Sequence, residues 1–254
     1  MTAPPGWYDD PSGAPGRRWW DGTQWTAAFV EPPRRRDAGR LVPFVVAGLL
    51  LCVVANVAGL AAFRTRLDVL DGAVLARATR SDHAVIVTGV LALTAFLATG
   101  VVWLFWFARL YHDAGLVRRV RFPVWAWAAW VVPFVNLVRP KQMVDDAWAA
   151  GDERMDVYTT PRNVPLVVHL WWLAFLVRTV LDSLSGVTSR SARVGNVAAA
   201  DLRNATRLAI AGNVATIVAA LLAVYVVVET TRRIDARYSA RVAPPSTGTT
   251  QPVT

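Results

Sequence analysis

Apolar residues dominate four stretches of the chain, at residues 41–63, 84–108, 164–184 and 207–229. A bilayer core about 30 Å thick requires roughly 20 apolar residues in helical form. The first stretch has 23 residues and no charged side chain. The pattern therefore predicts a mainly α protein, a polytopic helical membrane bundle with four spans between residues 41 and 234.

A fifth apolar segment, residues 122–138, has only 17 residues and is interrupted by Pro133 and Asn136. If it does not cross the membrane, 18 basic residues fall on one side and 9 on the other, and if it crosses the division is 15 to 12. Because cytoplasmic loops carry an excess of Lys and Arg, this count favours a broken, interfacial or re-entrant segment, with both ends of the chain cytoplasmic. Crossing stays open as the alternative.

Residues 140–150 predict a short amphipathic helix that starts at Pro140, since proline suits a first helical turn. One face of this helix carries Met143, Val144, Ala147 and Trp148, and the other carries Asp145 and Asp146. We expect it to lie at the membrane surface with its apolar side toward the lipid.

Residues 1–29 predict a small tryptophan-rich β module ahead of the membrane domain. Asp21-Gly22 lies between two strand-like runs and is typical of a two-residue type I′ turn. The expected aromatic core consists of Trp7, Trp25 and either Trp19 or Trp20. Two interpretations stay open, because these side chains would serve either as a peptide-binding face or only as the module's core.

Residues 30–40 form a basic, proline-containing linker, for which the double proline favours extended backbone. Its arginines are Arg34, Arg35, Arg36 and Arg40. We expect this cluster to hold its side of the protein in the cytoplasm and to contact anionic lipid. At the other end, residues 235–254 are polar and are expected to be a disordered tail.

The N-terminal module resembles the bacterial domain of unknown function 2510. The matching positions are Pro5, Gly6, Trp7, Tyr8, Pro11, Trp20, Asp21, Gly22, Trp25 and Thr26. That family is found mostly in actinobacteria, ahead of membrane spans, and has no established activity. The resemblance implies a docking or spacer module, and its candidate functional residues are Trp7, Tyr8, Trp20, Asp21, Gly22 and Trp25.

Residues 41–234 resemble the domain of unknown function 4328. The resemblance is carried by Trp130, Val132, Pro133, Asn136, Leu137, Pro140, Lys141, Gln142, Val144, Asp145, Asp146 and Trp148, and by WFARLYHDAG at 106–115. It implies a bacterial multi-span membrane domain and no particular activity. The candidate functional motif comprises Pro133, Asn136, Pro140, Gln142, Asp145, Asp146 and Trp148.

Charge and reactive groups narrow the function classes. The net charge is +9, but the basic residues flank the apolar stretches, which argues against nucleic-acid binding. The single cysteine, Cys52, and the three dispersed histidines predict no metal site, and no cofactor is expected. Known nucleophile, zinc and phosphate-loop motifs are missing from the sequence, so we do not expect an enzyme.

The polar residues singled out inside the spans are Asn56, His169, Arg178, Asp182 and Asn213, with His169 expected at the membrane interface. Arg178 and Asp182 share a helix face, and we expect Arg178 to extend toward the lipid headgroups. Asn56 and Asn213 are expected to hydrogen-bond between helices. Alanines at 211, 215, 219 and 223 form a small-residue seam that predicts close packing against this chain or a second copy.

Together these features predict a multi-pass plasma-membrane protein whose function is that of a non-enzymatic scaffold, regulator or interaction protein. Its expected partners are the lipid bilayer and a cytoplasmic or envelope protein bound by the N-terminal module, with association between copies of the chain as a further expectation. The alternative is a small-solute or ion pathway, suggested by the broken segment and by Asp145 and Asp146.

Overall fold

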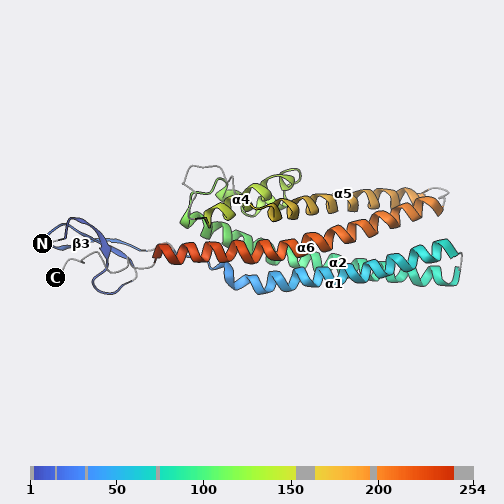
Figure 1. Cartoon of the computed structure of the whole chain (residues 1–254), viewed down its shortest axis with the longest axis horizontal. Helices are drawn as coiled ribbons and strands as arrows, with labels where there is room; N and C mark the ends of the chain where they lie inside the picture. The colour runs from blue at the N-terminus through green and yellow to red at the C-terminus, as the bar shows by residue number, and fades with distance from the viewer. Residues whose placement is uncertain are drawn as a thin grey trace.

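The structure, a computed structural model, describes residues 3–14, 16–31, 34–72, 75–152, 164–194 and 199–242. A small sheet precedes a bundle of long helices that lie side by side (Figure 1). The bundle consists of α1 (Val42–Gly72), α2 (Leu75–Val117), α5 (Leu166–Val194) and α6 (Ala199–Val242). Each of these helices contains a segment long and apolar enough to cross a membrane. The prediction of four spanning helices is confirmed.

The helices are longer than the apolar stretches that predicted them. α2 has 43 residues, which correspond to about 65 Å at 1.5 Å per residue, roughly twice the thickness of a bilayer core. α6 also continues to Val242, so residues 235–242, assigned to the tail from the sequence, are helical. Residues 243–254 lie outside the described part of the chain.

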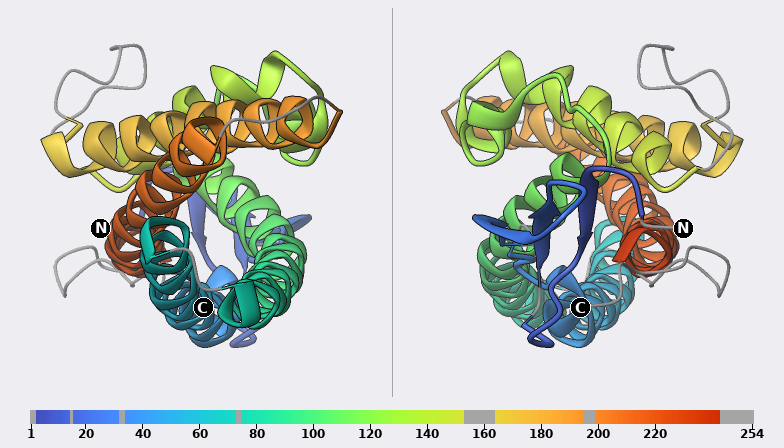
Figure 2. Two further views of the ribbon diagram at one scale, coloured as in Figure 1. Left: turned by 90° about the vertical axis from the view of Figure 1, so that its right-hand side faces the viewer. Right: turned by 90° about the vertical axis from the view of Figure 1, so that its left-hand side faces the viewer.

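Two antiparallel helix pairs, α1 with α2 and α5 with α6, join through contacts between α1 and α6. Figure 2 shows this arrangement from its two ends. Glycines allow close approach in the centre of the bundle. A Cβ atom at Gly48 would lie 2.6 Å from the Thr99 hydroxyl of α2, and one at Gly59 would lie 2.8 Å from Oδ1 of Asn213 on α6.

The segment between α2 and α5 begins as three short pieces, η2 (Pro123–Trp125), α3 (Ala128–Val131) and η3 (Val135–Leu137). None of them is long enough to cross a membrane. α2 ends and α5 begins at the same end of the bundle (Figure 1), so the non-crossing prediction holds. Phe134 and Val124 are 84% and 85% exposed, which suits a segment that lies at an apolar interface.

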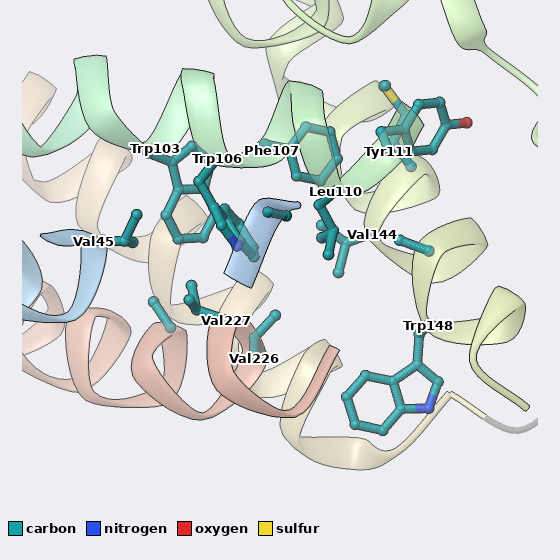
Figure 3. Packing of buried hydrophobic residues seen from close by; sticks show 14 of the residues in the cluster. Val45, Trp103, Trp106, Phe107, Leu110, Tyr111, Val144, Trp148, Val226 and Val227 are labelled. Carbon is teal, nitrogen blue, oxygen red and sulfur yellow. The ribbon is translucent and has the colours of Figure 1, made fainter. Parts of the chain in front are cut away.

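Helix α4 (Arg139–Ala150) forms where the sequence predicts it, but its apolar face is not turned to lipid. Met143, Val144, Ala147 and Trp148 are at most 4% exposed, because α4 packs against α2 and α6. The expectation of a helix lying apolar side down on the membrane was therefore wrong. Figure 3 shows Val144 and Trp148 beside the core residues of α2 and α6.

The N-terminal sheet is antiparallel and contains β1 (Gly6–Asp9), β2 (Arg17–Trp20) and β3 (Trp25–Val30) in that order. Trp20 pairs with Trp25, so the β2–β3 loop has four residues and is not the expected two-residue type I′ turn. Asp21 Oδ1 accepts hydrogen bonds from the backbone N–H groups of Thr23 (2.7 Å) and Gln24 (2.8 Å). This local side-chain capping favours the longer loop.

The alanine seam on α6 is buried along only part of its length. Ala219 and Ala223 are 8% and 3% exposed, whereas Ala211 is exposed. The seam therefore packs within this chain at one end, and the other end lies on the outer face of the bundle.

The side chain of Trp106 tests this packing, because it is fully buried and its indole donates to Oγ1 of Thr231 at 3.1 Å. We predict that Trp106→Ala lowers the free energy of unfolding by about 3–5 kcal/mol, since it leaves a cavity and removes the hydrogen bond from the indole to Thr231. Unfolding in mixed micelles with increasing SDS measures this loss. Leu93→Ala is the control on the same helix, because Leu93 is 58% exposed, and equal losses for the two variants would contradict the prediction.

Candidate functional site at the polar end of the bundle

Charged residues gather where α1 begins and where α2 and α6 end, a region called here the polar end. Its centre is Asp113 of α2, whose exposed fraction is 0%. The carboxylate accepts hydrogen bonds from the backbone N–H of Arg36 at 2.8 Å and of Ala38 at 3.3 Å. A buried carboxylate is costly unless it is paired and hydrogen-bonded, so the linker's backbone stabilises Asp113 and is itself held in place.

The guanidinium of Arg35 completes this arrangement. Its Nε lies 3.5 Å from Oδ2 of Asp113, and it also forms an ion pair with Asp235 of α6. The guanidinium lies 5.6 Å from the ring centre of Tyr238. Arg35 thus bridges α2 and α6, and the expectation that it contacts lipid was wrong. Arg34, by contrast, is on the surface and pairs with Glu31.

A second buried carboxylate, that of Asp146, connects α4 to the end of α2. It accepts hydrogen bonds from the hydroxyl of Tyr111 at 3.0 Å and from Nε of Arg121 at 2.7 Å. The backbone N–H of Arg121 donates to it as well, at 3.2 Å. The Tyr111 oxygen in turn accepts from the backbone N–H of Phe122 at 3.1 Å. Asp146 therefore positions the chain where it leaves α2.

The neighbouring carboxylate has a different role. Asp145 forms an ion pair with Lys141, one turn earlier on α4, at 2.5 Å. Asp146 is only 8% exposed, so the expectation that both acids occupy the outer face of α4 was wrong for Asp146. The two carboxylates have separate partners and do not make a shared acidic site.

The other members of the predicted motif are spread over this region. The side-chain oxygen of Gln142 accepts a hydrogen bond from Arg139 at 3.1 Å. The guanidinium carbon of Arg233 lies over the indole of Trp148, 4.5 Å from the centre of that ring. Pro140 is buried, Asn136 is half-buried and Pro133 is exposed. The motif therefore builds the junction between the broken segment and α4, and it does not converge on one reactive point.

The aromatic residues of the N-terminal sheet divide between its two faces. Trp20 is 5% exposed and packs edge-on against Trp25 at 5.2 Å between ring centres, with Tyr8 6.2 Å from Trp25. Trp7 lies on the opposite face, 43% exposed and 5.4 Å from Trp19. The prediction of one core that includes Trp7 was wrong, because neighbouring positions on a strand point to opposite faces.

Asp10 stabilises the turn after β1. Its carboxylate accepts from the backbone N–H of Ser12 at 2.8 Å and from Nε of Arg18 at 2.7 Å. The hydrogen bonds from Ser12, followed by the one from Arg18, hold the pKa of Asp10 below its ordinary value. Asp10 therefore stays ionised and links the turn to β2.

Polar side chains at membrane depth are mostly satisfied locally. The amides of Asn56 and Asn213 donate to carbonyl oxygens of their own helices, at Cys52 and Ala209, both at 2.8 Å, so the expected bonds between helices are not seen for these amides. The guanidinium of Arg178 packs 4.3 Å from the ring centre of Phe96, which places it inside the bundle. Within the described residues, no group of three His, Cys, Asp or Glu side chains is placed to hold a metal.

Two family models match the chain. Residues 71–232 match the family described as "Domain of unknown function (DUF4328)". The chain belongs to this family. Residues 5–38 match "Protein of unknown function (DUF2510)", so both resemblances are confirmed in the expected order. No curated protein and no solved structure matches the chain.

The second match extends past the sheet. It ends at residue 38, and Arg36 and Ala38 are the residues whose N–H groups bind Asp113. The family segment thus contains both the sheet and the segment that attaches it to the bundle. The sequence did not predict the structural roles of Asp113, Tyr111 and Arg121, and it placed Arg35 only in a basic cluster expected to contact lipid. For Tyr111 and Asp113 the available signal was the block at 106–115, which places both residues at the end of an apolar stretch.

The attachment of the linker is testable by proteolysis. We predict that Asp113→Asn increases trypsin cleavage after Arg35 and Arg36 roughly tenfold or more, because breaking a buried ion pair costs about 3–5 kcal/mol. The cleavage rate is measured on the full chain in detergent. Glu31→Gln removes only a surface ion pair of the same linker and should leave the rate unchanged. Equal protection in wild type and Asp113→Asn would show that this carboxylate does not hold the linker.

The adjacent acids of α4 provide a matched pair. We predict that Asp146→Asn lowers the free energy of unfolding by about 2–3 kcal/mol, because it weakens several hydrogen bonds to a buried charged acceptor. Asp145→Asn should cost less than about 1 kcal/mol, since it loses one ion pair within a helix. SDS-induced unfolding of the two single variants measures both values, and a larger loss for Asp145→Asn would refute this assignment.

Proposed function

We propose that this protein is a non-enzymatic scaffold of the plasma membrane that presents its N-terminal sheet to a cytoplasmic protein partner. The observation that carries the proposal is the attachment of the linker at Asp113, which fastens residues 35–38 to α2 and, through Arg35, to α6. A sheet on a free linker would sample many positions, whereas a linker anchored at the bundle limits the sheet to one end of the membrane domain.

The exposed face of the sheet supports a binding role. Trp7 and Trp19 form an edge-to-face pair at the strand register Trp7↔Trp19, and Trp7 remains 43% exposed. Tryptophans of this kind are enriched among the residues that contribute most to protein interfaces. The opposite face, with Trp20 and Trp25, supplies the packing of the sheet, which leaves the first pair free for recognition.

The charges of the polar end support two parts of the proposal, the cytoplasmic position of the N-terminal sheet and a function without catalysis. The linker arginines Arg34, Arg36 and Arg40 lie on the surface, as basic residues do on the cytoplasmic side of a membrane. The buried carboxylates of Asp113 and Asp146 are used to hold backbone N–H groups and arginines. A general acid or base needs reach to a substrate, and these two groups are enclosed by structural partners.

The aromatic pair provides the functional test. We predict that Trp7→Ala combined with Trp19→Ala lowers the recovery of crosslinked partner proteins at least fivefold, because the pair forms the exposed apolar face. The full-length protein is crosslinked in native membranes, and the partners are quantified by mass spectrometry.

Val30→Ala is the control, because Val30 is 50% exposed on the same sheet but outside the pair. Resistance to trypsin at Arg17 and Arg18 verifies that the sheet remains folded in each variant. A set of partners that is the same with and without the two tryptophans would overturn the proposal.

A further inference from the structure

The broken segment between α2 and α4 turns back along α2 before it reaches α4. Near its start, Arg121 binds Asp146, which also accepts a hydrogen bond from Tyr111 of α2. Further along, Trp130 contacts Trp103 of α2, with 5.4 Å between the ring centres. Trp103 and Tyr111 are eight residues apart. The segment therefore reaches about 12 Å farther into the membrane domain than Arg121 does, at 1.5 Å per helical residue.

The outer side of this segment is apolar. Val124, Val131 and Phe134 are 85%, 68% and 84% exposed, and Figure 2 shows the segment at the edge of the bundle. Phe134 has a φ of 63°, a left-handed backbone that is unfavourable for a bulky side chain. Water gives such an exposed ring no stabilisation, whereas hydrocarbon does. The segment is thus suited to contact the acyl chains of lipids.

Two guanidinium groups meet at the outer end of the segment. The guanidinium carbons of Arg121 and Arg139 lie 5.4 and 4.2 Å from the ring centre of Phe122. Gln142 of α4 accepts a hydrogen bond from each of them at 3.1 Å, with its backbone oxygen from Arg121 and with its side-chain oxygen from Arg139. The ring of Phe122 and the amide of Gln142 therefore hold both cations in place before any ligand arrives.

Positive charge exceeds negative charge in this part of the chain. Residues 118–146 contain five basic and two acidic side chains. Asp146 balances Arg121, but within the described residues no carboxylate pairs with Arg139, whose contacts are Phe122 and Gln142.

Both guanidinium groups are open to a ligand. The side chain of Arg121 is 42% exposed. No nitrogen of Arg139 is among the buried polar atoms that lack a partner, so the N–H groups that do not bind Gln142 are accessible. Arginine binds phosphate through parallel hydrogen bonds, which makes a phosphate group the ligand that fits two neighbouring guanidiniums.

We propose that Arg121 and Arg139 bind the phosphate of an anionic phospholipid, whose acyl chains run along the apolar outer side of the broken segment. The headgroup layer adds about 5–7 Å to each side of the hydrocarbon core. A segment that dips about 12 Å therefore places Val131 in hydrocarbon while the arginines stay at the level of the phosphates. An anionic headgroup also compensates the excess charge, whereas the choline of a zwitterionic lipid is repelled by it.

The test uses the full-length protein in liposomes with equal amounts of phosphatidylglycerol and phosphatidylcholine. In two matched preparations, one lipid or the other carries a diazirine in an acyl chain, and crosslinked residues are mapped by mass spectrometry. At residues 124–134 we expect the phosphatidylglycerol probe to give at least three times the yield of the phosphatidylcholine probe. At Leu91 and Leu93, which are 57% and 58% exposed on α2, the ratio should be near one. The same ratio at both places would overturn the proposal.

Two substitutions that remove one positive charge each separate a built site from a general field. Arg139→Gln should lower the ratio at residues 124–134 at least threefold. Arg36→Gln should leave it unchanged, because Arg36 is exposed and its backbone binds Asp113. Asp113 and Tyr111 are two residues apart on α2, so they point about 200° away from each other. An equal loss in the two variants would contradict a specific site.

The geometry of the guanidinium and the nature of the ligand are tested further. Arg139→Lys keeps the charge but loses the planar fork, and at least a twofold loss of the ratio is expected. This variant decides the question if Arg139→Gln fails to fold. A tenfold increase in salt should lower the wild-type ratio, since exposed charges are screened, and an unchanged ratio would contradict the proposal. Loss of the preference on addition of equimolar inorganic phosphate would refute the assignment to a lipid.

Discussion

A fully buried carboxylate determines how the two parts of this protein are joined. Asp113 at the end of α2 needs donors, and it finds them in the backbone of residues 36 and 38 and in the side chain of Arg35. Because a buried charge that loses its partners is strongly unfavourable, release of the linker would be costly. It would take the two backbone N–H groups and Arg35 away from Asp113 and leave the contact of its Oδ1 with Nδ1 of His112, at 3.3 Å. The entry of the chain into α1 and the position of the N-terminal sheet both depend on this interaction.

The same principle organises the other side of the polar end. Asp146 collects the Tyr111 hydroxyl and Arg121, which places α4 against α2 and lets α4 bury its apolar face in protein. The broken segment between them leaves Val124 and Phe134 exposed, and its tryptophans pack against α2. Trp130 contacts both Trp103 and Phe107. Trp103 and Trp130 also line a cavity among α1, α2, α5 and α6.

The proposed scaffold role rests on these structural interactions. The carboxylates that are best placed for chemistry are enclosed by structural partners, and the exposed features are an aromatic pair on the sheet and an apolar opening toward lipid. The attachment at Asp113 fixes the N-terminal sheet to one end of the membrane domain, which is the geometry that the proposed scaffold role requires.

The sequence by itself determined the four spanning helices, the existence of α4 and the small sheet, because hydrophobic length and strand-like runs are local properties of the chain. Tertiary structure alone decided that Asp146 is buried, that Arg35 pairs with Asp113 and Asp235, and that Trp7 and Trp20 lie on different faces. A sequence pattern shows that a helix has an apolar face, but lipid and protein both satisfy such a face. Only the positions of α2 and α6 show that protein covers the face of α4.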